Sequence, residues 1–438
     1  MKAKGELIMQ KKMLSMLLAG AMALTMLTPA TVASADEADK VKLTFYGWVD
    51  EESYLEPLFE AFNAQSETSY IEAQYCAVDE YEQVVLSALS AGTPIDVLAI
   101  NGLSPMSNYQ EKEMLIDMTE FAEASGFDAV ATYGDTYSGA NVDAMYGLPY
   151  RMAVWFMFYN KTMLEDLGAE IQTETSYTWT EFTEICLEVQ EKLKEKGMDI
   201  ESDPNNGCYA GLVGMNKNVT IAQRGVRLDD EDTSAIDEFW TLWNELQENG
   251  THLPYAEKLE YSTNVGSVYW VPGRIAFFQN ATWGISSYNT KMESGEMPFE
   301  YGCMPMPVPE GVEDGTNLSN PNFLGIPTTS EHAEEAYKFI EFACSHDGAL
   351  ILAEQGVLPA YADDEVTNAY TTYANQPDDA LARIISSPNN RLTDICFTGY
   401  AEMQAAYEEA MESYLVGNMT KEEALDAFVA KRDALLAE

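Results

Sequence analysis

The sequence predicts an α/β protein with more than one domain. Between Lys40 and Ile100 it alternates strand-like and helix-like patterns, which is typical of parallel strands joined by helices. A further apolar stretch, Met152–Tyr159, carries no charge, as expected for a strand that is buried on both faces. The roughly 400 residues that follow a predicted leader are enough for two or three domains of about 150 residues each.

Residues 1–35 are predicted to be a secretory signal peptide and to lie outside the fold. A start with four lysines precedes an apolar run, Met13–Leu27, and Ala33-Ser34-Ala35 forms a small-residue cleavage site. The apolar run is shorter than the roughly 20 residues of a membrane span, and an uncleaved anchor is the alternative. Cleavage after Ala35 leaves 403 of the 438 residues. We therefore expect an exported protein, periplasmic or extracellular.

The elements before residue 101 follow from local patterns. Lys40–Asp50 alternates and is rich in aromatic and other strand-forming residues, which predicts a strand. In the next stretch, Glu51–Gln65, the apolar residues fall on one helical face. A second strand is expected at Tyr70–Cys76, and the helix after it ends at Gly92, a residue suited to the position just beyond a helix. Ile95–Ile100 predicts a short buried strand.

Later elements are indicated by helix caps and by apolar spacing. Thr178 and Glu181 form a predicted capping box at the start of a helix, and Thr420 and Glu423 form a second one. The other expected elements are a helix with Phe239, Trp240 and Trp243 in the core, strands at Arg274–Asn280 and within Phe299–Gly311, and a strand and helix within Asn322–Cys344.

The charge of the chain limits its partners. It has 24 basic and 72 acidic residues, a formal net charge of −48, and loss of the leader with its four lysines and one glutamate makes this −51. Such a chain repels nucleic acid and anionic lipid, so we expect neither as a partner. No calcium-loop pattern occurs, and the acidic residues are expected to form a solvated surface. The six cysteines lie far apart, and we expect free or structural thiols, with disulfides as the alternative.

Catalytic and metal-binding motifs are missing from the sequence. It contains no H-E-x-x-H, G-x-S-x-G, Walker or G-x-G-x-x-G pattern. The three histidines, His252, His332 and His346, have polar neighbours and are expected to be exposed, which disfavours a zinc site or a histidine-based triad. A glycosidase pair of carboxylates stays open, because its defining feature is a separation in space. We expect no cofactor and no metal site.

Aromatic residues stand near the ends of several expected elements. Trp48 ends the first strand, Trp283 follows the Arg274–Asn280 strand, Trp155 lies in the apolar stretch, and Tyr400 lies before the last helices. In α/β sheets, ligands bind beyond the carboxyl ends of strands. Aromatic rings match the apolar faces of sugars, while Asp, Asn and Arg side chains match the hydroxyl groups. Core packing is the alternative role for each ring, but together the rings favour a carbohydrate site.

With these features in order, the chain resembles the family 1 extracellular solute-binding proteins of ABC importers, the group of the maltose-binding protein. The resemblance covers nearly the whole chain after the leader, and it depends on the order and spacing of several segments. These segments are LTFYGWVD, LSALSAGTPIDVLAI, YGLPY with FYNKTMLEDLG, TWTEFTEI, GRIAFFQNATWG, YGCMPMPVPEG, FLGIPTTSEHAEEAYKFIEFA and GVLPAY.

The resemblance implies a two-lobed periplasmic-binding-protein fold of type II. Each lobe would be a mostly parallel sheet flanked by helices, and a multi-segment hinge would let the lobes close over a ligand. The implied N-terminal lobe is 36–152 plus 300–345, and the C-terminal lobe is 153–299 plus 346–438. The first crossing between lobes is expected in Pro149–Lys161, and the crossing back near Tyr301–Pro307.

The resemblance also implies candidate ligand contacts. Trp283 matches a position where the family often has a sugar-stacking tryptophan, and Tyr400 matches a less regular aromatic position. Arg151 would stand at the cleft edge, where it either donates hydrogen bonds to a ligand or forms an ion pair with a carboxylate. The candidate ligand-binding residues are Trp283, Trp48, Asp50, Asn101, Arg151, Asn322 and Tyr400.

The implied function is that of a monomeric receptor. It would capture a carbohydrate, with an oligosaccharide expected, and deliver it to the permease subunits of an ABC transporter without catalysis. A binding protein for a cationic solute such as a polyamine is one alternative, suggested by the charge, and a secreted carbohydrate-active enzyme is another. The leader ends in Ala-Ser-Ala-Asp with no cysteine nearby, so the lipid anchor found in many Gram-positive relatives is not expected.

Overall fold

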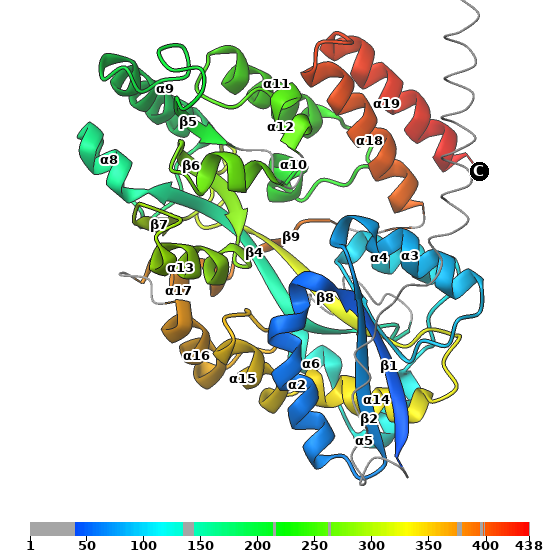
Figure 1. The fold of residues 1–438 in the computed structure, drawn as a ribbon. Helices are drawn as coiled ribbons and strands as arrows, with labels where there is room; N and C mark the ends of the chain where they lie inside the picture. Colours follow the sequence, from blue (N-terminus) through cyan, green and yellow to red (C-terminus); the bar gives the residue numbers. More distant parts are fainter. Residues whose placement is uncertain are drawn as a thin grey trace, which may run out of the picture. The chain divides into compact units, whose positions relative to one another are not determined.

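The structure, a computed structural model, describes residues 40–134, 144–212, 216–261, 264–374, 379–394, 397 and 399–437. The predicted signal peptide lies outside these residues. Within them, strands form one sheet in the order β2-β1-β3-β8-β4-β6-β5, to which β7 adds beside β4 and β9 beside β8. The α/β fold class is confirmed, with helices flanking this sheet in each of two lobes (Figure 1).

Most strands lie close to the positions that the sequence predicts, but β5 and β9 were not predicted. In the first lobe, β1 pairs in parallel with β2 and β3. Antiparallel pairs join β3 to β8 and join β4 to β6, β7 and β8, so the sheet as a whole is mixed. The strands are β1 (Val41–Trp48), β2 (Ser69–Cys76), β3 (Val97–Ile100), β4 (Leu148–Asn160), β5 (Tyr209–Leu212), β6 (Ile275–Ala281), β7 (Tyr301–Met304), β8 (Leu318–Gly325) and β9 (Arg391–Leu392).

Two of the long helices begin at capping boxes that the sequence predicts. Both predicted capping boxes are present, with the side chains of Thr178 and Thr420 each accepting from the backbone N–H three residues later. The helices are α2 (Glu52–Gln65), α3 (Val78–Ser90), α4 (Leu103–Glu111), α5 (Thr119–Ser125), α6 (Ala129–Tyr133), α8 (Lys161–Leu167), α9 (Trp179–Glu195), α10 (Val219–Arg224), α11 (Ser234–Glu248), α12 (Tyr255–Tyr261), α13 (Gly284–Ser294), α14 (Ala333–Ala343), α15 (His346–Glu354), α16 (Asp364–Ala374), α17 (Ala380–Ile385), α18 (Tyr400–Leu415) and α19 (Lys421–Leu436), with a short helical turn at Val49–Glu51 and a π-helical turn at Gly266–Trp270.

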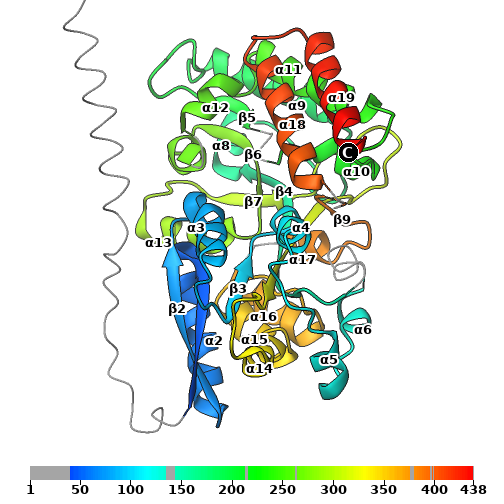
Figure 2. The same ribbon diagram turned by 90° about the vertical axis from the view of Figure 1, so that its right-hand side faces the viewer.

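Three clusters of buried side chains define the two lobes. The first cluster joins β1 to β3, the start of β4 and the end of β8 with helices that include α2, α3 and α14. The other two lie on opposite faces of the second half of β4, one with α9, α11 and α18 and the other with α13, α16 and α17. Met157 faces one of these clusters, and Phe156 and Phe158 face the other, which confirms the strand predicted to be buried on both sides. Figure 2 shows α18 and α19 together in one lobe and α2 and α14 in the other.

The strands β4 and β8 run antiparallel, side by side, between the lobes (Figure 1). The crossing back is therefore β8, and the prediction of Tyr301–Pro307 for it is wrong. Tyr301–Met304 forms β7, pairs with the last residues of β4, and is buried in the second lobe. A third segment meets β4 at the same place, since the Met152 N–H donates to the Leu358 carbonyl at 2.8 Å.

One histidine departs from the expectation of exposure. His252 is 1% exposed, and its Nδ1 lies 2.9 Å from the Thr251 hydroxyl. Burial lowers the pKa of His252 to about 3. The ring fits because Gly211 on β5 has no side chain: a Cβ there would stand 2.4 Å from His252 Nε2. His332 and His346 are partly exposed beside carboxylates.

The described residues include all three histidines and five of the six cysteines. Among them, no group of three or more His, Cys, Asp or Glu side chains is placed to hold a metal ion. Nor does that part of the chain contain a helix both long and apolar enough to cross a membrane. Cys396 lies outside the described residues. The free cysteines are Cys76, Cys186, Cys208, Cys303 and Cys344.

Candidate functional site

One face of the two crossing strands carries residues that the sequence selects. Side chains on a strand alternate between its faces, so Arg151 and Trp155 on β4 point to the same side. In register opposite Arg151 stands Asn322 of β8, and opposite Trp155 stands Leu318, with Asn320 between them. We call this surface, made of Arg151, Trp155, Leu318, Asn320 and Asn322, the crossing face.

Arg151 is bound by Glu51, a carboxylate that the sequence did not single out. The Arg151 Nε donates to Glu51 Oε1 at 2.9 Å, and the two side chains are 11% and 0% exposed. The hydroxyls of Tyr54, at 2.6 Å, and Tyr150 donate to the same oxygen. A register shift in β4 between Pro149 and Arg151 allows two consecutive side chains to reach one carboxylate. Of the two roles expected for Arg151, the ion pair is therefore present.

Aromatic rings enclose the Arg151 guanidinium. Its central carbon lies 5.4 Å from the ring centroid of Trp48, 6.0 Å from that of Tyr54 and 5.8 Å from that of Tyr150. At these distances a cation is attracted to the face of a ring. Trp48 is only 4% exposed and also packs edge-on against Tyr81. Burial raises the pKa of Glu51, while the nearby Arg151 charge opposes that rise.

Two asparagines connect the first lobe to the crossing face. The Asn322 amide donates to Asn101 Oδ1 at 2.8 Å, with Asn322 buried and Asn101 exposed just after β3. Gly102 follows in a left-handed conformation, and a Cβ there would lie 2.9 Å from the Asn320 amide, so a glycine is needed. Asp50 is exposed just after β1. The structure thus brings Asn101 and Asn322 into contact.

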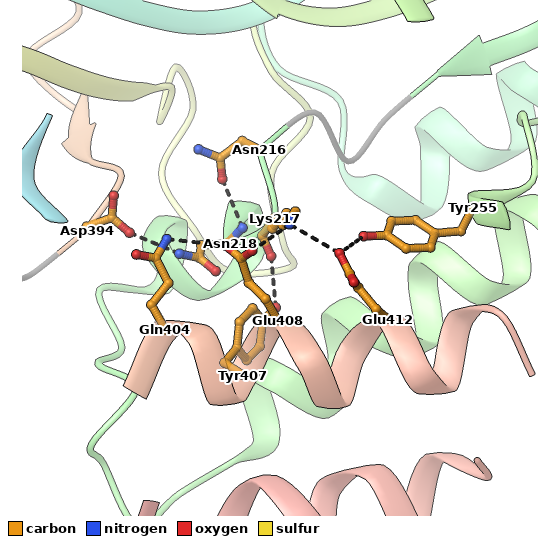
Figure 3. A network of polar contacts seen from close by, with 9 residues as sticks. All are labelled: Asn216, Lys217, Asn218, Tyr255, Asp394, Gln404, Tyr407, Glu408 and Glu412. Carbon is orange, nitrogen blue, oxygen red and sulfur yellow. Dashed lines mark hydrogen bonds and ion pairs between the residues drawn. The ribbon is translucent and has the colours of Figure 1, made fainter. Parts of the chain in front are cut away.

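Tyr400 reaches the crossing face through other side chains. It is 2% exposed, and its hydroxyl donates to Asp394. Asp394 also accepts from Thr393 at 2.9 Å. A further bond reaches it from the Asn218 amide at 3.0 Å (Figure 3). The Thr393 hydroxyl lies 3.4 Å from Asn320 Oδ1. Burial raises the pKa of Asp394. Tyr400 therefore orders Asp394 and has little surface to offer a ligand.

The turn that holds Asn218 is fastened to α18 by charged groups (Figure 3). Lys217 Nζ lies 2.5 Å from Glu408 and 3.3 Å from Glu412, and the Tyr407 hydroxyl donates to the Lys217 carbonyl at 2.8 Å. Both glutamates line a surface hollow of about 490 Å³. None of the residues that line this hollow is a candidate from the sequence, and two of its glutamates, Glu408 and Glu412, are already paired with Lys217.

Trp283 is the exposed aromatic residue at the second-lobe end of the crossing face. It lies two residues after the end of β6, is 46% exposed, and its ring lies 4.6 Å from that of Trp155 at 90°. Trp155 stands within β4 rather than at an element end, and its indole N–H is buried without a partner among the described residues. The pair gives an apolar wall beside the amides of β8.

The structure therefore gathers the candidates into two groups. One group lies at the first-lobe end of the crossing face and consists of Arg151, Trp48, Asn101 and Asn322. At the other end, Trp283 packs against Trp155. Asp50 is exposed, and Tyr400 joins only through Asp394. Sequence reasoning missed three polar residues of the site, which are Glu51, Asn320 and Asp394.

Comparison with known proteins adds a family and a shared fold. The family model for bacterial extracellular solute-binding proteins matches residues 57–377. A sugar transporter from Rhizobium etli, solved in an open conformation, is 23% identical with a TM-score of 0.75, over 90% of this chain and 99% of that one. An ABC substrate-binding protein from Listeria monocytogenes, in complex with cycloalternan, is 20% identical with a TM-score of 0.75, over 91% and 98%. A sugar-binding protein from Xanthomonas citri is 19% identical with a TM-score of 0.71, over 91% and 98%.

Proposed function

Because the chain belongs to the bacterial extracellular solute-binding proteins, we propose that it binds an oligosaccharide between its lobes and delivers it to an ABC transporter permease. The observation that carries the carbohydrate proposal is the crossing face. This face carries the guanidinium of Arg151 and the amides of β8, and the exposed ring of Trp283 packs against Trp155 at its second-lobe end. A sugar needs this combination, because its C–H faces are apolar and its hydroxyls require donors and acceptors.

The connections between the lobes support a hinged mechanism. The chain passes from lobe to lobe at β4, at β8 and near Leu358, so bending there would close both lobes on a ligand. Both walls of the site come from one chain, so a monomer suffices. We propose that the predicted leader exports the protein to the periplasm or the extracellular space.

A neutral ligand is favoured over a polyamine by the state of the nearby carboxylates. A polyamine site needs several carboxylates that are available to the ligand. Here Glu51 accepts from Arg151 and two tyrosines, and Asp394 accepts from three side chains. Solute-binding families bind without turnover, so we also propose that the sugar leaves the protein unchanged.

A thermal-shift screen of residues 36–438 tests the proposal. The probes are neutral mono- and oligosaccharides, with polyamines and amino acids as counter-ligands. A ligand at 100 times its Kd stabilises the native state by about 2.7 kcal/mol, which gives a clear rise in melting temperature. We expect such a rise with one class of neutral oligosaccharide, recovered intact after incubation. A rise with polyamines alone, or shortened sugar products, would contradict the proposal.

A further inference from the structure

We propose that Glu51 is a positioning residue that makes Arg151 an electrically compensated hydrogen-bond donor, and that the site thereby selects uncharged sugars over anionic ones. This inference rests on the proposed function, because it concerns the ligand of that same site. It adds the charge class of the ligand and names the residue that sets it.

The contacts of Glu51 account for the compensation. Oε1 accepts from Arg151 Nε at 2.9 Å and from the hydroxyls of Tyr54 and Tyr150, while Oε2 is buried without a partner among the described residues. A carboxylate with no exposed surface cannot use water to balance its charge. Its charge is balanced instead by the guanidinium beside it, so the pair is close to neutral as a unit.

The geometry of Arg151 leaves part of the guanidinium for a ligand. Within the described residues, only its Nε makes hydrogen bonds, and the two terminal amino groups make none. Rings of Trp48, Tyr54 and Tyr150 surround its central carbon at 5.4 to 6.0 Å and limit its rotation. The side chain is 11% exposed, at the end of the crossing face where Asn322 and Asn101 meet. Arg151 is thus a fixed donor beside two amides.

Charge decides which sugar such a donor favours. A carboxylate on a ligand usually gains from a free arginine through a charged pair. Here Glu51 is already the anionic partner of Arg151. A ligand carboxylate would add a second negative charge beside it, in a protein of net charge −48. A hydroxyl accepts from the same amino groups without that repulsion. The site should therefore bind a neutral oligosaccharide in preference to one built of uronic acids.

Glu51→Gln tests this inference, with Glu52→Gln as the matched control. Both variants lose one negative charge at adjacent positions, but Glu52 is exposed. Maltotriose, cellotriose and xylotriose are the neutral probes, and trigalacturonic acid is an anionic probe of equal length, each measured by calorimetry. We expect the wild type to bind one neutral probe at least about tenfold more tightly than the anionic one, since like-charge contacts are costly. Glu51→Gln should lower this ratio by about tenfold, and Glu52→Gln should leave it unchanged.

Other outcomes overturn the inference. If Glu51→Gln weakens neutral and anionic probes in equal proportion, Glu51 is only structural. If Glu52→Gln changes the ratio as much, the effect belongs to the net charge of the protein and not to the Arg151 pair.

A ligand-free measurement separates failure of the inference from failure of the proposed function. Glu51→Gln should lower the melting temperature, and the double variant with Arg151→Gln should recover part of the loss, because an unpaired buried charge has been removed. If the double variant recovers melting temperature but the wild type binds none of the probes, the compensated pair is supported and these sugars are not the ligands. A double variant no more stable than Glu51→Gln would overturn the compensation.

Discussion

Among single residues, Trp283 gives a direct test of the site. Its ring is 46% exposed and stands on Trp155, so Trp283→Ala removes a surface and little buried core. Since stacking contributes about 1 kcal/mol beyond buried area, we expect at least about fivefold weaker binding of the sugar found in the screen. Calorimetry measures this, with Tyr373→Ala on α16 as an exposed aromatic control. Unchanged affinity in Trp283→Ala would remove Trp283 from the site.

The buried ring of His252 predicts a pH dependence. Its folded-state pKa is about 3, below the roughly 6.5 of an exposed histidine, so the unfolded chain binds a proton first as pH falls. The wild type should therefore lose about 1.4 kcal/mol of stability per pH unit from this ring between about pH 6 and 4. His252→Asn lacks that loss, so its stability deficit should shrink on acidification in urea denaturation. A deficit that stays constant from pH 7 to pH 5 would contradict the prediction.

His346 supplies a control of opposite sign. Neighbouring carboxylates, Asp347 first, raise its pKa in the folded state. Its stabilising contribution is therefore present at low pH and is lost as pH rises through the folded-state pKa. His346→Asn should consequently lose more stability at pH 5 than at pH 8, the reverse of the trend for His252→Asn.

The individual residues show how far the sequence can predict a site. Trp283 and Arg151 were selected because each stands where a recognisable segment begins or ends. Arg151 lies on the crossing face, and Trp283 contacts Trp155 at the end of that face. Glu51 was not selected, because nothing in the sequence distinguishes it from the other acidic residues, which number 72 in all. His252 was predicted to be exposed, and this prediction failed because its ring fills the space left by Gly211. Gly211 is 41 positions away in the sequence and becomes adjacent only in the folded sheet.

At the scale of elements, the capping box of α9 gives a prediction of stability. Thr178 accepts from the Glu181 N–H, and Glu181 accepts from the Thr178 N–H at 2.8 Å. Thr178→Ala leaves a helix-start N–H without its side-chain partner, which should cost about 1 kcal/mol. Thr180→Ala, at an exposed position in the first turn, is the control and should change stability much less. Equal losses in urea denaturation would show that the cap contributes nothing specific.

Elements were predictable where their signal is local. Caps and the helical spacing of apolar residues located α9 and α11, and alternation located β1. Strand pairing could not be predicted in this way, because it depends on partners that are far apart in the sequence. Both β7 and β8 are short strands near prolines, and only the ladder to β4 shows that β8 is the crossing. The mixture of parallel and antiparallel pairs also depends on this pairing, since β4 and β8 run in opposite directions between the lobes.

At the scale of the whole molecule, the two lobes meet outside the hinge as well as within it. The Gly399 N–H, at the start of α18 in the second lobe, donates to Glu111 at the end of α4 in the first at 2.9 Å. Local patterns alone predicted an α/β chain, and the order of segments was needed to predict two lobes. The proposed site lies on β4 and β8, the strands that join the lobes, so binding and lobe movement should be coupled.

That coupling gives the last prediction, which is that a bound sugar closes the lobes. A ligand that contacts both Asn101 of the first lobe and Trp283 of the second binds the closed form more tightly, and so shifts the population toward it. Small-angle X-ray scattering should then show a smaller radius of gyration with the sugar found in the screen than without it. A sugar that gives no thermal shift should leave the radius unchanged. Trp283→Ala should need more sugar to reach the same compaction, because it weakens binding without altering β4 or β8. A radius that stays constant at saturating sugar would show that the lobes hold one arrangement and that the site is preformed.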